Sequence, residues 1–261
     1  MINEVNFNNK TMRYFKFGSG LKTIIMIPGL SAKSVMESEE IVKNEYKELT
    51  SDFTIYCFDR INNPNIGYSI KDMAKDTLDV VDILNLKDLY LLGASQGGMI
   101  CLSMALIKPE LIKKIVVAST TTKVDEKLKN HMNRFISLSK EKKLVELILD
   151  FSKLIYPEDF YLKMESFLID YANSITDVEL KNFIIFADAI NNFDIFDEIG
   201  KINKPVLFVH DKTDNLISID NFYKVMDKYK NFNYYIYENY GHTLYDLAPD
   251  FKGRIKEFYN L

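Results

Sequence analysis

The stretch Leu89-Tyr90-Leu91-Leu92-Gly93-Ala94-Ser95-Gln96-Gly97-Gly98-Met99 carries the strongest signal in this chain. An apolar run typical of a buried strand ends in Gly-x-Ser-x-Gly, and a helix-like segment follows. A serine hydroxyl becomes a nucleophile when it is held exposed on a turn too sharp for most side chains. Gly93 and Gly97 flank Ser95 because a Cβ at either position would collide with backbone at such a turn. The pattern predicts a nucleophile elbow at Ser95; the alternative is a glycine-rich loop whose serine only caps the helix.

Three histidines are available as a base for this serine. His242 lies in the loop 239–243, which follows a strand-like run and contains a preceding glycine that permits an unusual loop conformation. His210 closes a predicted strand, and His131 lies in a polar, helical stretch. We predict that His242 is the base and that the other two histidines are structural.

The acid that orients the imidazole should come from a rigid strand end near the histidine loop. Asp211 and Asp214 both follow the strand predicted over 205–209. Asp214 is favoured because the loop then has room to turn back toward His242, whereas Asp211 is close enough to the strand end to sit in the turn. The resulting order along the chain, Ser95 then Asp214 then His242, differs from the orders of the chymotrypsin and subtilisin arrangements.

At these motifs the chain resembles the α/β-hydrolase superfamily, from about Asn8 to the C-terminus. The resemblance implies a mostly parallel central sheet with helices on both faces and an inserted helical cap. Four landmarks carry it: Ile27-Pro28-Gly29-Leu30, Asp59-Arg60 with Gly67-Tyr68-Ser69, the elbow at Ser95, and His210 to Asp214 followed by Gly241-His242.

The same resemblance implies an oxyanion hole. In the family, the loop after the third strand usually reads His-Gly, and the next residue donates one oxyanion N–H. Pro28-Gly29 occupies this place here, so Leu30 inherits the donor role, and Gln96, directly after the nucleophile, is the second donor. Asp211 stands where the family commonly has glycine, which leaves open which aspartate is the acid.

The rest of the chain alternates short apolar runs with amphipathic segments, which favours a mostly parallel sheet covered by helices. A chain of 261 residues that is 47% hydrophobic can bury one large core. A helix predicted over 70–84 places one stripe of side chains at helical spacing against the sheet. The predicted strands cover 11–17, 23–27, 53–58, 89–92, 114–118, 205–209 and 233–237.

Residues 121–199 show no strand pattern but are apolar at helical spacing, so several helices are expected. The resemblance places a cap (lid) here, over residues 121–200, on a core formed by 1–120 and 201–261. We expect most of its aromatic residues to pack within the cap and the remainder to line an apolar pocket above Ser95, with Phe160 and Phe186 as examples to test. The aromatic candidates are Phe151, Tyr156, Phe160, Phe167, Phe183 and Phe186.

Charge and composition exclude several classes of partner. The net charge is −4 and no basic stripe is interleaved with aromatics, which argues against nucleic-acid binding. No signal-like N-terminus and no long apolar run occurs, so we expect a cytoplasmic protein without a membrane partner. Cys57 and Cys101 are expected to be buried free thiols. No metal-ligand spacing or phosphate-binding glycine loop is present, so no metal or cofactor is expected.

The sequence thus predicts a soluble, carboxylesterase-like serine hydrolase, monomeric or homodimeric, whose partner is a small-molecule acyl substrate. Ser95 would attack the carbonyl while His242 takes its proton and Asp214 orients the imidazole. Lactonases, carbon–carbon bond hydrolases and acyltransferases use the same triad, so these reactions stay open. A ligand sensor that keeps the triad and pocket without turnover is the alternative from another class.

Overall fold

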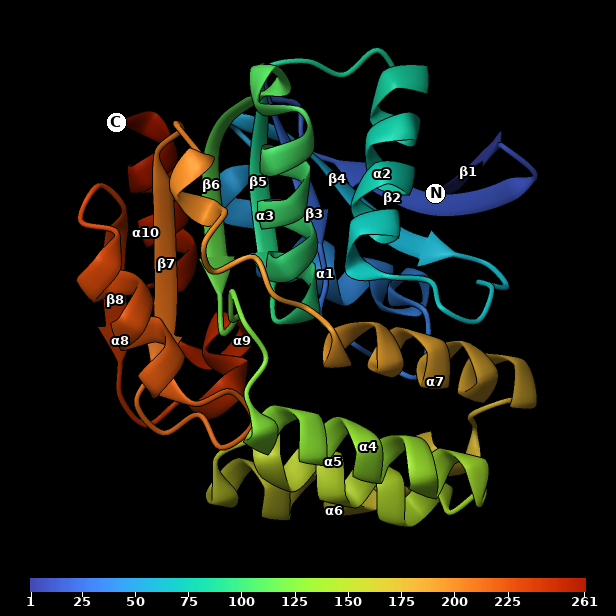
Figure 1. Cartoon of the computed structure of the whole chain (residues 1–261). Helices are drawn as coiled ribbons and strands as arrows, with labels where there is room; N and C mark the ends of the chain where they lie inside the picture. The colour runs from blue at the N-terminus through green and yellow to red at the C-terminus, as the bar shows by residue number, and fades with distance from the viewer.

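A sheet of eight strands forms the centre of the computed structural model, which describes residues 1–261 (Figure 1). The strands are β1 (Ile2–Phe7), β2 (Lys10–Phe17), β3 (Lys22–Ile27), β4 (Phe53–Ile61), β5 (Leu89–Ala94), β6 (Ile112–Ala118), β7 (Val206–Asp211) and β8 (Asn233–Tyr237). Their order across the sheet is β1-β2-β4-β3-β5-β6-β7-β8. β2 pairs antiparallel with β1 and β4, and all other neighbours are parallel. The predicted mostly parallel sheet is therefore confirmed.

The sequence interpretation missed β1, the edge strand. Its sequence, INEVNF, is polar enough to lack a clear apolar alternation. β1 and β2 form a hairpin through Asn8 and Asn9, whose φ angles are 45° and 59°. Two consecutive residues with positive φ are the signature of a type I′ hairpin turn, which favours asparagine. The Asn-Asn pair was thus the signal that could have revealed this strand.

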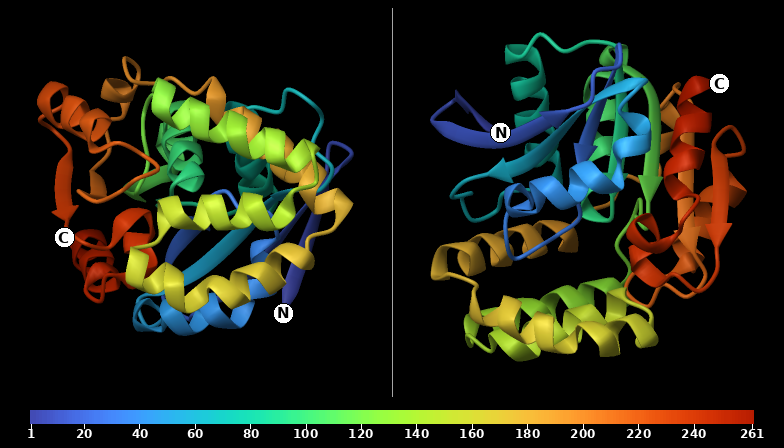
Figure 2. Two further views of the ribbon diagram at one scale, coloured as in Figure 1. Left: turned by 90° about the horizontal axis from the view of Figure 1, so that it is seen from below. Right: turned by 180° about the vertical axis from the view of Figure 1, so that it is seen from behind.

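Helices cover both faces of the sheet. They are α1 (Glu39–Glu45), α2 (Ile70–Ile83), α3 (Gln96–Ile107), α8 (Ile219–Lys228), α9 (Leu244–Leu247) and α10 (Phe251–Asn260). Because side chains alternate along a strand, Ile25 and Ile27 of β3 pack in the core with α2, α3 and α8, whereas Ile24 and Met26 pack on the other face with α9 and α10. Figure 2 shows α1 and α10 together on this second face.

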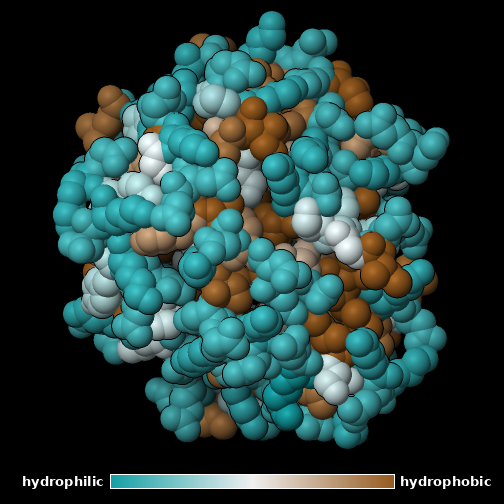
Figure 3. Space-filling view, in the orientation of Figure 1, coloured by the Kyte–Doolittle hydropathy of each residue, from teal (hydrophilic) through white to brown (hydrophobic).

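Four further helices lie between β6 and β7 in the chain: α4 (Glu126–Lys140), α5 (Leu144–Ile155), α6 (Glu158–Asn173) and α7 (Asp177–Asn191). We call them the α4–α7 layer. They form a separate group beyond the carboxyl ends of the parallel strands (Figures 1 and 2). Apolar side chains reach the surface over α7 on the face drawn in Figure 3.

The chain enters and leaves the α4–α7 layer at one place. Val124 N donates to Phe193 O at 3.0 Å, and Ile195 N donates to Thr122 O at 2.8 Å. An isolated antiparallel bridge pairs the two segments between these bonds. The two crossings are therefore fastened to each other by backbone hydrogen bonds.

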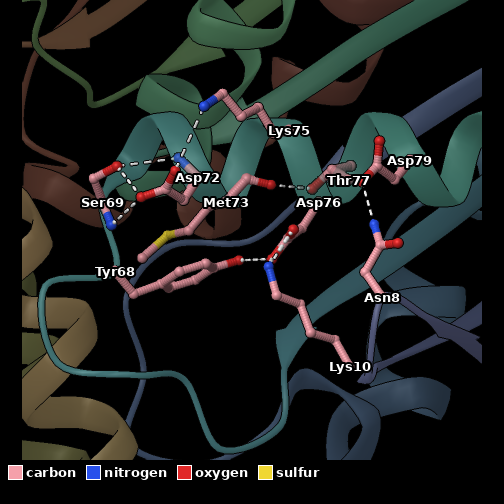
Figure 4. A network of polar contacts seen from close by, with 10 residues as sticks. All are labelled: Asn8, Lys10, Tyr68, Ser69, Asp72, Met73, Lys75, Asp76, Thr77 and Asp79. Atoms are coloured by element: carbon pink, nitrogen blue, oxygen red, sulfur yellow. Dashed lines mark hydrogen bonds and ion pairs between the residues drawn. The ribbon is translucent and has the colours of Figure 1, made fainter.

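A buried carboxylate ties the hairpin to α2 and to the loop after β4 (Figure 4). Asp76, only 4% exposed, accepts both Lys10 Nζ (2.7 and 2.8 Å to its two oxygens) and Tyr68 Oη (2.6 Å). The Tyr68 ring in turn lies 6.4 Å from that of Phe186 in α7, measured between centroids. A buried charge is tolerated when it is paired and hydrogen-bonded, and here the pairing orders the loop that reaches the α4–α7 layer.

Candidate active site

Ser95 occupies a sharp turn between β5 and α3. Its backbone has φ 52° and ψ −122°, a conformation that residues other than glycine rarely adopt. A Cβ on Gly97 would lie 1.9 Å from Ile27 O, and a Cβ on Gly93 would lie 2.5 Å from Gly97 O. Both glycines are therefore required by the close approach of α3 to the sheet, as the Gly-x-Ser-x-Gly pattern indicates.

His242 and Asp214 form a buried pair. His242 Nδ1 lies 2.8 Å from Asp214 Oδ2, and the two side chains are 2% and 0% exposed. Because an ionised carboxylate only accepts hydrogen bonds, Nδ1 is the donor and Nε2 is left free to take a proton. The other oxygen of Asp214 accepts the N–H groups of Leu216 and Ile217, each at 2.9 Å. The carboxylate is thereby fixed in orientation from both sides.

The charge state of Asp214 follows from these contacts. Burial by itself raises the pKa of this carboxyl, but the charge of His242 and its hydrogen bond outweigh burial. The pKa of Asp214 is therefore held below its usual value, and the group is ionised near neutral pH. An ionised Asp214 would stabilise an imidazolium at His242.

Asp211, the second candidate acid, makes no contact with the imidazole. Its Oδ1 accepts the backbone N–H of Thr213 at 2.7 Å and the Thr213 hydroxyl at 2.6 Å. Its Oδ2 accepts the N–H of Tyr240 at 2.9 Å, and Thr213 Oγ1 accepts the N–H of Gly241 at 3.3 Å. Asp211 thus fastens the loop that carries His242 to the end of β7.

Two backbone donors flank Ser95. The N–H of Leu30 donates to no acceptor within the protein, and Gln96 is the first residue of α3, where helical N–H groups have no intrahelical partner. Gly29 brings the Leu30 segment close, since a Cβ on Gly29 would lie 3.2 Å from Ser95 Cβ. An anion beside Ser95 would therefore meet two unpaired N–H groups and the positive end of the α3 dipole.

An apolar pocket opens at Ser95 and contains ≈250 Å³ of empty space, part of it open to solvent. Except for Ser95, every residue that lines it is apolar. The core contributes Leu30, Met99, Leu216 and Ile217; the α4–α7 layer contributes Leu128, Met132, Phe151 and Ile190. Leu216 and Ile217, whose N–H groups donate to Asp214, line the same pocket as Ser95, so Asp214 lies directly behind the pocket wall. No hydrogen bond joins Ser95 Oγ to His242; such bonds often tighten only when substrate binds.

The aromatic residues chosen from sequence as pocket examples were wrong. Phe160 packs on Tyr156, with ring centroids 4.9 Å apart, and Phe186 packs near Tyr68. Phe151 is the aromatic residue that lines the pocket. Helical spacing identified an apolar face on each helix, but it could not tell which face turns toward Ser95.

Arg60 and the side chain of Gln96 form a polar link that sequence reasoning left without a role. Arg60 Nη2 donates to Pro28 O at 2.6 Å and to Gln96 Oε1 at 3.0 Å. Gln96 Nε2 donates to Phe186 O in α7 at 2.6 Å. The link joins the loop after β3, the start of α3 and the α4–α7 layer.

The remaining candidates from sequence lie in structural settings. His210 is buried, its Nε2 lies 3.2 Å from Ile217 O, and its ring stacks on Phe222. His131 lies on α4, and its ring stacks on the ring of Phe135. Cys57 and Cys101 are free and buried, as predicted, and burial raises the pKa of both thiols. No group of three or more His, Cys, Asp and Glu side chains is placed to hold a metal. None of the helices combines the length and the apolar character that a membrane span requires.

Comparison with known families and curated proteins gives three matches that bear on this site. The family model described as the alpha/beta hydrolase fold matches residues 22–249. A putative carbamate hydrolase RutD of Agrobacterium fabrum is 27% identical over 203 residues, which is 75% of this chain and 76% of that protein. A putative esterase/lipase of Haemophilus influenzae is 26% identical over 220 residues, which is 78% of this chain and 74% of that protein.

Solved structures show the same fold. MGS-M2, an alpha/beta hydrolase enzyme from a deep-sea metagenome library, superposes with a TM-score of 0.88 at 18% identity, covering 99% of this chain and 98% of that one. The enol-lactonase of Burkholderia xenovorans superposes with a TM-score of 0.86 at 14% identity, covering 99% and 100%. At such low identity these likenesses concern the arrangement of the backbone.

Proposed function

This chain belongs to the α/β-hydrolase family, and from that premise we propose that it is a serine hydrolase for short, uncharged acyl esters. The Asp214–His242 hydrogen bond of 2.8 Å carries the proposal, because it orients a buried imidazole on a carboxylate that two residues of the Ser95 pocket wall hold in place. An aspartate that only stabilised a loop would not need to bond a histidine side chain. Asp211 is such a residue, and it bonds only its own neighbours and the histidine loop.

In the proposed reaction Ser95 Oγ attacks the acyl carbon while His242 Nε2 takes the hydroxyl proton. The carbonyl electrons move to oxygen, and the N–H groups of Leu30 and Gln96 stabilise that oxyanion, each donor being worth ~3 kcal/mol. The alcohol then leaves with the proton from Nε2, which gives an acyl-enzyme. Water repeats the two steps, releases the carboxylic acid and restores Ser95.

The pocket supports a small, neutral acyl group. Of its ≈250 Å³ of empty space, part of which is open solvent, only ≈10 Å³ can hold the centre of a water-sized sphere, which favours a small acyl group. No cation lines it, so an ionised substrate would be desolvated without a counter-ion. The relatives named as putative carbamate hydrolases make a carbamate the second substrate to test, in the form of a neutral carbamate ester.

The α4–α7 layer is proposed as the cap that selects the acyl group. It supplies four of the pocket residues, namely Leu128, Met132, Phe151 and Ile190. This supports a division of the chain into a cap of residues 121–200 and a core of 1–120 with 201–261. In this arrangement the core supplies the chemistry, and the cap supplies much of the wall that meets the substrate.

The test combines active-site labelling with turnover. A fluorophosphonate should attach to Ser95, as identified by mass spectrometry of the labelled peptide, and p-nitrophenyl acetate and butyrate should be hydrolysed steadily. Ser95→Ala should abolish labelling and lower kcat by about 10⁶-fold, whereas Ser103→Ala, in the α3 helix that follows Ser95, should change neither. Labelling without steady turnover would favour a ligand sensor, and an adduct on another serine would refute the assignment.

A further inference from the structure

We propose that Arg60 is the positioning residue of the oxyanion hole, fixing both donor segments through one guanidinium nitrogen. The inference rests on the proposed function, since it concerns how Leu30 and Gln96 are held for catalysis. Arg60 lies in β4, which β3 separates from β5, the strand that ends at the serine.

The geometry places one atom between the two donor segments. Arg60 Nη2 donates to Pro28 O, two residues before Leu30, and to the side chain of Gln96. Pairing of β3 with β5 ends at Ile27 and Gly93, and beyond it no backbone hydrogen bond joins the loop after β3 to Gln96. Because the oxyanion must meet both N–H groups at about 3 Å, a bridge between the segments sets the width of the hole.

The side chain of Gln96 extends the bridge to the α4–α7 layer. Its Oε1 accepts from Arg60, and its Nε2 donates to Phe186 O in a buried hydrogen bond of 2.6 Å. Both ends of the amide are therefore used, which fixes its rotation about the terminal bond. The residue whose N–H serves the oxyanion is held between the core and α7.

The charge on Arg60 has no carboxylate partner. No carboxylate oxygen lies within 4.0 Å of its guanidinium, and its Nε is buried without any partner. The adjacent Asp59 is engaged elsewhere, by the Arg60 backbone N–H and by the Ser34 hydroxyl. Burial lowers the pKa of Arg60, yet a guanidinium stays protonated in proteins. The charge of Asp59 offsets part of this lowering, and the Arg60 side chain is half-buried. A half-buried cation with no direct ion pair would stabilise negative charge that develops nearby during a reaction.

Arg13 provides a matched control. It lies on β2, its Nε is likewise buried without a partner, and its guanidinium approaches Asp59 at 3.7 Å. It contacts neither Pro28 nor Gln96. Removal of either arginine deletes one partly buried cation beside Asp59, but only Arg60 contacts the donor segments.

The experiment measures p-nitrophenyl butyrate hydrolysis by Arg60→Met and Arg13→Met. Arg60→Met should lower kcat by roughly 10–100-fold while KM changes by less than about twofold. The reason is that misplaced donors reduce the stabilisation of the transition state but leave substrate binding unchanged. Butane-1-boronic acid, which forms a tetrahedral serine adduct with an oxygen in the hole, should bind more weakly by a similar factor. Arg13→Met should keep kcat and boronate affinity near the wild-type values.

Several outcomes would overturn the inference. These are an unchanged kcat in Arg60→Met, an equal loss in Arg13→Met, or a loss of kcat without weaker boronate binding. If Arg60→Met does not fold, Gln96→Met tests the same bridge with the backbone donor intact, and an unchanged kcat there refutes it. Wild-type labelling and turnover are measured first: their absence refutes the proposed hydrolase, whereas their presence with full activity in Arg60→Met refutes only the role of Arg60.

Discussion

Shortening Phe151 should lengthen the acyl chain that the pocket accepts. Phe151 is a partly buried aromatic residue of the α4–α7 layer that lines the pocket at Ser95. A buried methylene is worth ~0.8 kcal/mol and corresponds to about 30 Å² of apolar area, while a fully buried aromatic side chain covers ~150–250 Å². Partial exposure reduces the ratio of these areas to about three to seven methylenes, and alanine keeps the Cβ, so we take the lower end: Phe151→Ala should create room for about three more methylenes.

The assay is a series of p-nitrophenyl esters of increasing acyl length. In the wild type, kcat/KM should rise about fourfold per methylene and then fall where the pocket ends. In Phe151→Ala the fall should come about three methylenes later. Phe167→Ala is the control, because that residue is 58% exposed on α6 and does not line the pocket. An unmoved limit in Phe151→Ala, or an equal shift in the control, would refute the assignment of the pocket wall.

Three further predictions concern the acid, a buried histidine and the hairpin network. Asp214→Asn should lower kcat by about 10⁴-fold, because an amide favours the wrong imidazole tautomer. Asp211→Asn should mainly lower Tm, because the new amide would place a donor against N–H groups that the Asp211 carboxylate now accepts. Kinetics and melting curves of the Asp214 and Asp211 variants are compared, and equal losses of kcat would contradict the separate roles of the two aspartates. Burial lowers the pKa of His210, so below about pH 6.5 the unfolded chain binds a proton that the native state does not. The free energy of unfolding should therefore fall by up to about 1.4 kcal/mol per pH unit from this group as pH drops from about 6.5 toward the native pKa. Urea titrations of wild type and His210→Gln measure this slope, and identical slopes would show that the histidine is not responsible. Tyr68→Phe should lower the free energy of unfolding by about 1–2 kcal/mol, because Asp76 loses one buried hydrogen-bond donor. An unchanged midpoint of urea unfolding would contradict the role of that hydrogen bond.

The elbow could be predicted from sequence because its constraints are local. A strand that turns sharply into a helix needs residues without a Cβ at the positions of Gly93 and Gly97. This requirement is visible in five consecutive residues of the sequence. The strands of the parallel core were found for a similar reason, since buried strands are continuous apolar runs. β1 was missed because an edge strand with one solvated face needs no such run.

The pocket wall and the role of Arg60 depend on contacts between distant segments. Phe151 and Phe160 lie in successive helices with similar apolar neighbours, and only the packing of those helices decides which ring reaches Ser95. Arg60 is 32 residues from Pro28 and 36 from Gln96 along the chain. A single sequence does not show which distant segments come into contact. The acceptors of a charged residue in a strand therefore cannot be predicted from its neighbours in the chain.

The paired backbone crossings at Thr122–Val124 and Phe193–Ile195 give the molecule a modular architecture. Because the two ends are already hydrogen-bonded to each other, the intervening helices form a closed loop whose length hardly affects the entropy of joining its ends. Insertions, deletions or wholesale replacement of those helices would leave β6 and β7 paired as they are. In the proposed arrangement, selection could thus change which molecules are accepted while Ser95, Asp214 and His242, in the other part of the chain, keep their places.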